Sequence, residues 1–243
     1  FTDEWTLKSI VKKYSDFIEY PIRMEVTRSE SEKNEQGEDI TKETQKDETL
    51  NSQKALWQRA TKDIKEEDHN EFYKHLTHDF SAPLDKIHYK AEGTQEFTAL
   101  IYFPSTVPWD YNHRDMKFGL NLYVKRVFIT DSCEQLIPQY MRFLKGIVDS
   151  SDLPLNISRE LIQKDRQIIA IRKALVSKIL RHMKTRLEKE RDQYIQFWEK
   201  FGATFKEGLT EDSSNKNDIT ELLLFRSNKT DTYTTLADYL DRM

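Results

Sequence analysis

Apolar residues at the start of the chain recur at helical spacing and then change to a strand-like alternation. Segment 3–18 carries lysines between apolar residues that mostly fall on one face, which predicts an amphipathic helix. Its apolar positions are Trp5, Ile10, Val11, Tyr14, Phe17 and Ile18. The helix is expected to end before Pro21, because a residue that precedes proline is disfavoured in the helical region. Apolar and polar residues alternate over 22–26, which predicts a half-buried strand.

A highly charged stretch follows this strand. Residues 28–49 contain no aromatic side chain and almost no apolar one. Such a stretch cannot bury enough apolar surface to offset the entropy that ordering it would cost. The sequence therefore predicts a mobile charged loop over 28–49, inserted between the first strand and the rest of the chain.

The middle of the chain predicts one helix and several strands. Residues 66–76 have helical periodicity, and segments 84–90 and 96–103 are typical of a β-hairpin. Over 120–129 an alternating pattern changes to a continuous apolar run, which indicates a strand entering a region buried on both faces. The short pair 147–148 is compatible with another strand or with the last turn of a helix.

The chain from Glu160 onward is predicted to be helical almost throughout. A first apolar stripe comprises Ile168, Ile171, Leu175, Ile179, Met183 and Leu187. A second comprises Tyr194, Phe197, Phe201 and Phe205. The sequence therefore predicts an α/β unit (α+β in its element order) over 1–155, followed by a small helical bundle over 156–243.

Composition restricts the class of protein. The 243 residues suffice for one large domain or two smaller ones, and 37% hydrophobic with 33% charged residues suits a moderate core under a charged surface. The net charge of -4 gives no reason to expect nucleic acid as a partner, because phosphate-binding domains carry a concentrated basic excess. The longest apolar runs, 99–103 and 222–225, are far too short to span a bilayer, so no membrane partner is expected.

The single cysteine and the chain ends give expectations about the cellular setting. Cys133 alone cannot form an intrachain disulfide, which fits a reducing compartment and favours the cytoplasm. The chain lacks an initiator methionine and a signal-peptide hydrophobic region, and it ends abruptly at Met243. We therefore expect a segment cut from a longer protein, in which any activity that needs flanking domains is missing.

No motif for independent catalysis is visible. With six glycines the chain has neither GxGxxG nor a Walker loop, so we do not expect this segment to bind ATP alone. His75 and His78 precede Asp79 at a spacing that could serve zinc, but no second ligand cluster completes a site, so we expect no metal. Cys133 lacks a basic neighbour that would lower its pKa, which favours a packed residue over a nucleophile. A stand-alone hydrolase is disfavoured because no nucleophile–base pair appears.

Arg159 occupies a position where local rules conflict. It stands where helical periodicity begins, and a helix start prefers an anion to a cation. An arginine beside free backbone amides is a good receptor for phosphate oxygens, and Gln163 lies one turn further on the same face. A surface ion pair of Arg159 with Asp152 or Glu160 is the alternative, and the residues alone favour it.

Trp109 follows Pro108 in a loop predicted to connect two strands. A loop tryptophan is more often an anchor packed onto its own domain than a residue that contacts a partner. Both interpretations of Trp109 stay open from the sequence, and the first is favoured.

Five segments, in the same order, resemble the heat-shock-protein-90 family of chaperones, in its bacterial form. They are 12–22 (KKYSDFIEYPI), 71–80 (EFYKHLTHDF), 122–131 (LYVKRVFITD), 146–160 (GIVDSSDLPLNISRE) and 236–243 (LADYLDRM). The resemblance covers nearly the whole chain except the charged stretch and residues about 211–233. It implies the middle domain of a dimeric ATP-driven chaperone, with a large three-layer α/β/α sandwich followed by a small helical segment.

The resemblance also implies partners and site residues. ATP, with Mg²⁺, is expected to be bound mainly by the protein's own N-terminal domain. The homodimer contact is expected to lie in a C-terminal domain. Unfolded or partly folded proteins are the expected clients. Arg159 matches the family's catalytic-loop arginine, which reaches the ATP γ-phosphate, and Gln163 matches its glutamine. Trp57 and, more weakly, Trp109 match positions expected to contact clients. The alternative is a non-catalytic interaction module in which Arg159 is structural.

Overall fold

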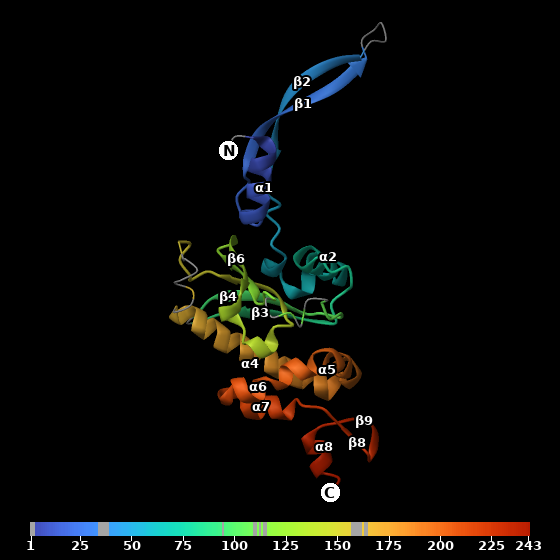
Figure 1. Cartoon of the computed structure of the whole chain (residues 1–243). Helices are drawn as coiled ribbons and strands as arrows, with labels where there is room; N and C mark the ends of the chain where they lie inside the picture. The colour runs from blue at the N-terminus through green and yellow to red at the C-terminus, as the bar shows by residue number, and fades with distance from the viewer. Residues whose placement is uncertain are drawn as a thin grey trace.

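The computed structural model describes residues 3–33, 39–93, 95–108, 111, 113, 116–156, 162 and 165–243, with residues 28–33, 39–43 and 230 described by their backbone alone. A five-stranded sheet lies between two helical layers in the middle of the molecule (Figure 1). The N-terminal elements extend away from one side of this sandwich, and the C-terminal elements lie at the opposite end (Figure 1).

The sheet has the strand order β3-β4-β7-β5-β6. Its strands are β3 (Asp85–Ala91), β4 (Phe97–Phe103), β5 (Leu120–Val124), β6 (Val127–Cys133) and β7 (Lys145–Ser150). β5 and β7 run parallel, and the other neighbouring strands are antiparallel. The hairpin predicted over 84–90 and 96–103 is confirmed as β3 and β4. The ambiguous pair 147–148 lies in β7, the central strand of the sheet.

One face of the sheet is covered by short helices that precede it in the sequence. The helix α2 (Glu66–Thr77) confirms the prediction over 66–76, and the 3-10 helices η1 (Leu56–Gln58) and η2 (Thr61–Asp63) come just before it. Alternate strand residues turn to this side because successive side chains of a strand point to opposite faces. The buried cluster here comprises Ala55, Leu56, Trp57, Tyr73, Leu100, Tyr102, Tyr123 and Ile147.

The opposite face is covered by α4 (Arg166–Lys189) and α5 (Arg191–Lys206). Both predicted apolar stripes are confirmed, because every residue named in them is buried. Phe103 of β4 lies 5.8 Å from Phe197 of α5, measured between ring centroids, so a single core crosses residue 155. The first two helices of the predicted bundle therefore also form the second outer layer of the sandwich (Figure 1).

Short elements complete the chain on the far side of α5. They are α6 (Gly208–Glu211), η5 (Ser213–Asn215), α7 (Lys216–Glu221), β8 (Phe225–Ser227), β9 (Thr230–Thr234) and α8 (Leu236–Leu240). Two further 3-10 helices, η3 (Glu134–Leu136) and η4 (Gln139–Met141), lead from β6 to β7. Thr235 caps α8 in a reciprocal arrangement with Asp238, which fixes the start of this last helix.

The expectation of a mobile loop over 28–49 is wrong for residues 28–33 and 39–49. They belong to β1 (Arg23–Lys33) and β2 (Asp39–Thr49), an antiparallel ribbon that extends beyond α1 (Glu4–Tyr14) (Figure 1). The register runs from Arg23 opposite Thr49 to Lys33 opposite Asp39. The two strands hydrogen-bond to each other and lie outside the core. They therefore need no apolar alternation, which is the pattern that sequence analysis uses to recognise a strand.

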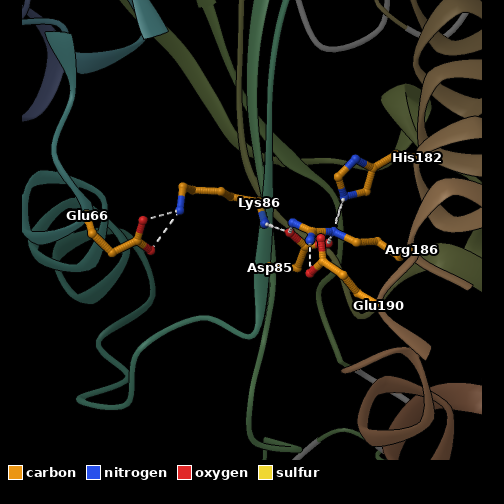
Figure 2. Close-up of polar contacts among 6 residues, drawn as sticks. All are labelled: Glu66, Asp85, Lys86, His182, Arg186 and Glu190. Atoms are coloured by element: carbon orange, nitrogen blue, oxygen red, sulfur yellow. Dashed lines mark hydrogen bonds and ion pairs between the residues drawn. The ribbon is translucent and has the colours of Figure 1, made fainter. Parts of the chain in front are cut away.

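A chain of polar contacts crosses all three layers of the sandwich. Neighbouring residues of β3 point to opposite faces: Lys86 bonds Glu66 of α2, and Asp85 faces α4 (Figure 2). Arg186 donates to both Asp85 oxygens, at 2.8 and 2.5 Å, and His182 Nε2 lies 2.7 Å from Oδ2. Burial would raise the pKa of Asp85, but its contacts with His182, Arg186 and the Lys86 N–H hold that pKa below its usual 3.8.

Replacement of Asp85 by asparagine is expected to lower the free energy of unfolding by about 3 kcal/mol, because Arg186 loses its largely buried partner. The folded-state pKa lies below the unfolded one, so this contribution is present above pH 3.8 and is lost as the pH falls through the folded value. Chemical denaturation at neutral and acidic pH measures both effects. Glu66→Gln is the control, because this more exposed carboxylate should contribute less than about 1 kcal/mol. Equal losses in the two variants would contradict the prediction.

Candidate functional site

The predicted site lies in the connection between β7 and α4. Arg159, Gln163 and Trp109 themselves lie outside the described residues. The structure does describe how the connection 151–165 leaves the sheet, where it is anchored and where it enters α4. These contacts define the frame that holds the candidate site.

Hydrogen bonds fix the start of the connection at the end of β7. Ser150 Oγ accepts from the backbone N–H groups of Asp152 and Leu153, both at 3.3 Å. The Asp152 carboxylate accepts from the Glu96 N–H at 2.7 Å, which ties the turn to the start of β4. Leu153 is buried in the main core. The chain therefore leaves the sheet in one defined direction.

The turn between β5 and β6 lies against the same strand end. Lys125 and Arg126 adopt left-handed backbone conformations, with φ of 51° and 66°, which matches the tight turns that connect neighbouring strands. The N–H of Lys125 donates to the Ser150 carbonyl at 3.0 Å, and that of Arg126 donates to Asp149 Oδ1 at 3.1 Å. The ammonium-bearing side chain of Lys125 is exposed here. Two cationic residues thus flank the point where the connection begins.

Ile162 anchors the connection between Arg159 and Gln163. Its side chain is 2% exposed and belongs to the main core. It borders a cavity of about 220 Å³ that is also lined by Thr130, Cys133 and Gln135. Burial raises the pKa of the Cys133 thiol to about 11, so this cysteine is a packed neutral residue, as predicted. Sequence analysis missed Ile162, although the apolar pair 161–162 within a polar stretch was the available signal.

Asp165 ends the connection by capping α4. Its Oδ1 accepts from the N–H groups of Gln167 at 2.7 Å and Ile168 at 3.2 Å. This is the preferred chemistry for a helix start, because it satisfies amides that have no partner inside the helix. Helical periodicity was predicted from Glu160, whereas the described helix α4 begins at Arg166. The connection is therefore held at both ends and at Ile162.

Trp57, which the resemblance linked to clients, lies in the core. Its side chain is 1% exposed, and Nε1 donates to the buried Asp149 carboxylate at 2.8 Å. Phe17, Phe72 and Tyr123 pack around its ring. The Trp57 indole is therefore packed inside the core of this structure.

Sequence analysis did not single out one exposed aromatic residue, which lies on a loop that is hydrogen-bonded to a second loop. Phe80 is 88% exposed and follows His78, whose left-handed backbone ends α2. Thr106 Oγ1 donates to the Asp79 carboxylate at 2.8 Å, which joins this loop to the segment that leads to Trp109. Val107 on that segment is also exposed. The signal for Phe80 was an aromatic residue directly after a helix end, outside any apolar period.

Metal-ligand clusters and membrane-spanning helices are both absent from the described part of the chain. No three His, Cys, Asp or Glu side chains in it come together as ligands for a metal ion. None of its helices combines the length and the apolar character that crossing a bilayer requires.

A solved structure shares this architecture. It is the middle domain of a Plasmodium falciparum heat shock protein, which matches 78% of this chain and 74% of its own with a TM-score of 0.69 and 33% sequence identity. The sandwich is therefore the fold of a heat-shock-protein middle domain.

Sequence comparison identifies the family. The sequence model described as Hsp90 protein matches residues 1–49 and 24–243, and the chain belongs to this family. A relative named chaperone protein HtpG, from Bdellovibrio bacteriovorus, is 53% identical over all of this chain and 36% of its own length. Another of that name, from Geobacter sulfurreducens, is 52% identical over all of this chain and 38% of its own length. The chain thus spans less than two fifths of these relatives.

Proposed function

We propose that this chain acts as the middle domain of an ATP-dependent chaperone and supplies Arg159 to the γ-phosphate of ATP held by an N-terminal domain. One observation supports the proposal above the others. The connection that carries Arg159 leaves the carboxyl end of β7, beside the carboxyl end of the parallel strand β5, and is pinned by Ile162 and Asp165. Ligand sites of α/β sheets commonly occur at such strand ends.

The chemistry required of Arg159 is limited to recognition of charge. A guanidinium group donates two parallel hydrogen bonds to phosphate oxygens and stays charged at all physiological pH values. Charge that develops on a transferred phosphoryl group is stabilised by such a cation, and Gln163 can add a neutral donor to the same oxygens. Lys125, at the start of the connection, makes the local potential more positive.

In this proposal the chain contributes only part of the site for the nucleotide and its metal ion. Mg²⁺, when bound with the nucleotide, would neutralise part of the phosphate charge. The proposal places the protein ligands of this ion, with the nucleotide, on the N-terminal domain. As the family resemblance implies, we also propose that a C-terminal domain forms the homodimer contact. We propose the cytoplasm as the location of the protein.

ATP hydrolysis by a mixture of two separate domains tests the proposal. Addition of this chain to the isolated N-terminal domain should raise its rate of hydrolysis, and the same chain with Arg159→Ala should not. An equal rise with both chains would support the alternative, in which Arg159 is structural and the chain is an interaction module.

Binding of unfolded client proteins is a second proposed function, supported by the exposed surface around Phe80. Exposed apolar groups that are held in place by their own loops are typical of contact sites for other proteins. Phe80 and Val107 meet this description, and the hydrogen bond between Thr106 and Asp79 keeps their loops together. Trp109, which the resemblance linked to clients, follows two residues beyond Val107 in the sequence and lies outside the described residues.

Phe80→Ala is expected to weaken binding of a permanently unfolded, reduced and carboxymethylated protein by about tenfold, because aromatic anchors contribute roughly 1–2 kcal/mol or more to such contacts. Fluorescence anisotropy of the labelled client measures the change. Tyr20→Ala is the matched control, since Tyr20 is also an exposed aromatic residue (76%) but lies by the N-terminal elements. Equal affinities of the Phe80 variant and the wild type would rule this surface out.

A further inference from the structure

A hydrogen-bonded joint connects the N-terminal elements to the sandwich. The buried Asn51 side chain donates to the carbonyls of Ile18 and Tyr20, at 3.0 and 2.9 Å, and accepts from the Ile22 N–H at 2.8 Å. The Ser52 N–H donates to the Asp16 carboxylate at 2.8 Å. The segment after α1 and the segment after β2 are therefore bonded together, and we call residues 15–22 and 50–53 the N-terminal joint.

Trp57 connects this joint to the core of the sandwich. Phe17, which belongs to the joint, packs edge-on against the Trp57 ring with 4.7 Å between ring centroids. On another side, Tyr123 of β5 lies 5.0 Å from Trp57. The indole is thus held between the joint and the sheet, and its N–H is directed at a single acceptor, Asp149.

Asp149 joins three separate elements through one buried carboxylate. The side chain is only 4% exposed and lies on β7, one residue before the strand ends. Oδ2 accepts from Trp57 Nε1 at 2.8 Å and from Gln58 Nε2 at 3.0 Å, while Oδ1 accepts from the Arg126 N–H at 3.1 Å. These donors come from η1 and from the turn between β5 and β6. A carboxylate is required here because both of its oxygens act as acceptors.

We infer that Asp149 is a positioning residue, which sets the start of the Arg159 connection relative to the N-terminal joint. Ser150, the next residue, begins that connection through its hydroxyl, so a displacement of Asp149 moves the first fixed point of the connection. The inference rests on the proposed function, and it adds a way in which the contact of Arg159 with phosphate is regulated. The orientation of the N-terminal elements is transmitted through Trp57 and Asp149 to the residue that contacts phosphate.

The structure defines which substitutions break this link. Asparagine at position 149 offers one acceptor oxygen and one N–H₂ group, so at least one of the three donors loses its partner. Phenylalanine at position 57 keeps an aromatic ring between Phe17 and Tyr123 but removes the N–H that bonds Asp149. The two variants perturb the same contact from opposite sides, and the second one does so without altering the strand.

The test measures ATP hydrolysis by a chain that also carries the N-terminal domain. Asp149→Asn is expected to lower kcat by roughly 10–100-fold with KM for ATP within about twofold, because a small misplacement of a catalytic group costs about this much. Trp57→Phe should lower kcat in the same direction by a smaller factor. In an Arg159→Ala background, Asp149→Asn should cause no further loss, because a positioning residue acts through the group it positions.

Asp85→Asn separates positioning from stability, because it breaks a buried contact of the same domain on the face away from Trp57. It should lower the thermal midpoint of unfolding yet leave kcat unchanged at a temperature where all variants are folded. The inference is overturned if Asp149→Asn and Trp57→Phe keep wild-type kcat, or if the losses caused by Asp149→Asn and Arg159→Ala multiply. If Arg159→Ala itself keeps wild-type kcat, the proposed function fails instead.

Discussion

Arg159→Ala, in a chain that also carries the N-terminal domain, is expected to lower kcat for ATP hydrolysis by at least about 100-fold, the loss typical when one preorganised donor or cation is removed from a charged transition state. KM for ATP should change by less than about threefold, because the nucleotide is held mainly by the other domain and this arginine acts on charge that develops during transfer. Steady-state hydrolysis at several ATP concentrations separates the two parameters.

Two further variants make the expected result specific to Arg159. Arg166→Ala removes the same charge seven positions later, from an exposed residue in the first turn of α4, and should retain wild-type kcat. Arg159→Lys keeps the charge but loses the planar pair of donors, so its kcat should lie between those of alanine and arginine. Wild-type kcat in Arg159→Ala would contradict the proposed phosphate contact, and equal losses in the Arg159 and Arg166 variants would point to a general effect of charge.

The helices and the first hairpin of the sandwich could be predicted because their apolar patterns are local. The stripe from Ile168 to Leu187 has the period of one helical face, and every residue named in it is buried in α4. The hairpin of β3 and β4 was visible for the same reason, since consecutive strands need no information from distant parts of the chain. Periodicity therefore suffices for an element that presents one face to a continuous core.

Residues 27–33 of β1, all of β2 and the place of β7 in the sheet were not predicted, for two opposite reasons. β1 and β2 form a ribbon outside the sandwich, so charged residues are tolerated along them and no apolar alternation develops. β7 is the central strand, with neighbours on both edges, but its apolar part is only the short pair 147–148. Its position depends on pairing with β4, about fifty residues earlier, and with β5, and no local pattern records such pairing.

The candidate site, like the fold, could be predicted from the sequence only where a local pattern indicated it. Arg159 and Gln163 came from a local anomaly and from the resemblance, and they stay predictions because both lie outside the described residues. The buried contact between Trp57 and Asp149 joins residues 92 positions apart, and nothing near either residue indicates it. Phe80 was overlooked because exposure is a property of the folded surface. Sequence thus suggested the chemical group, while the frame that holds it required the structure.

Gly146→Ala is expected to cause the largest loss of stability of any single methyl addition described for this chain, at about 4 kcal/mol or more. Gly146 is the second residue of β7 and pairs with Ile101 of β4. A Cβ at this position would lie 2.2 Å from the Leu100 carbonyl oxygen and 2.9 Å from the Ile101 Cα, and both are backbone atoms. Neither can move without separating β4 from β7, so the centre of the sheet must open.

Gly93→Ala is the matched control for this substitution. Its φ of 131° is also unfavourable for alanine, but no atom lies within 4 Å of the added Cβ. Backbone strain alone costs about 1–3 kcal/mol, so the difference in unfolding free energy between the two variants isolates the steric contact. Chemical denaturation of the chain measures both. Equal losses would mean that β4 and β7 can separate at little cost, and Asp149, three residues after Gly146, could not then hold the Arg159 connection in a fixed position.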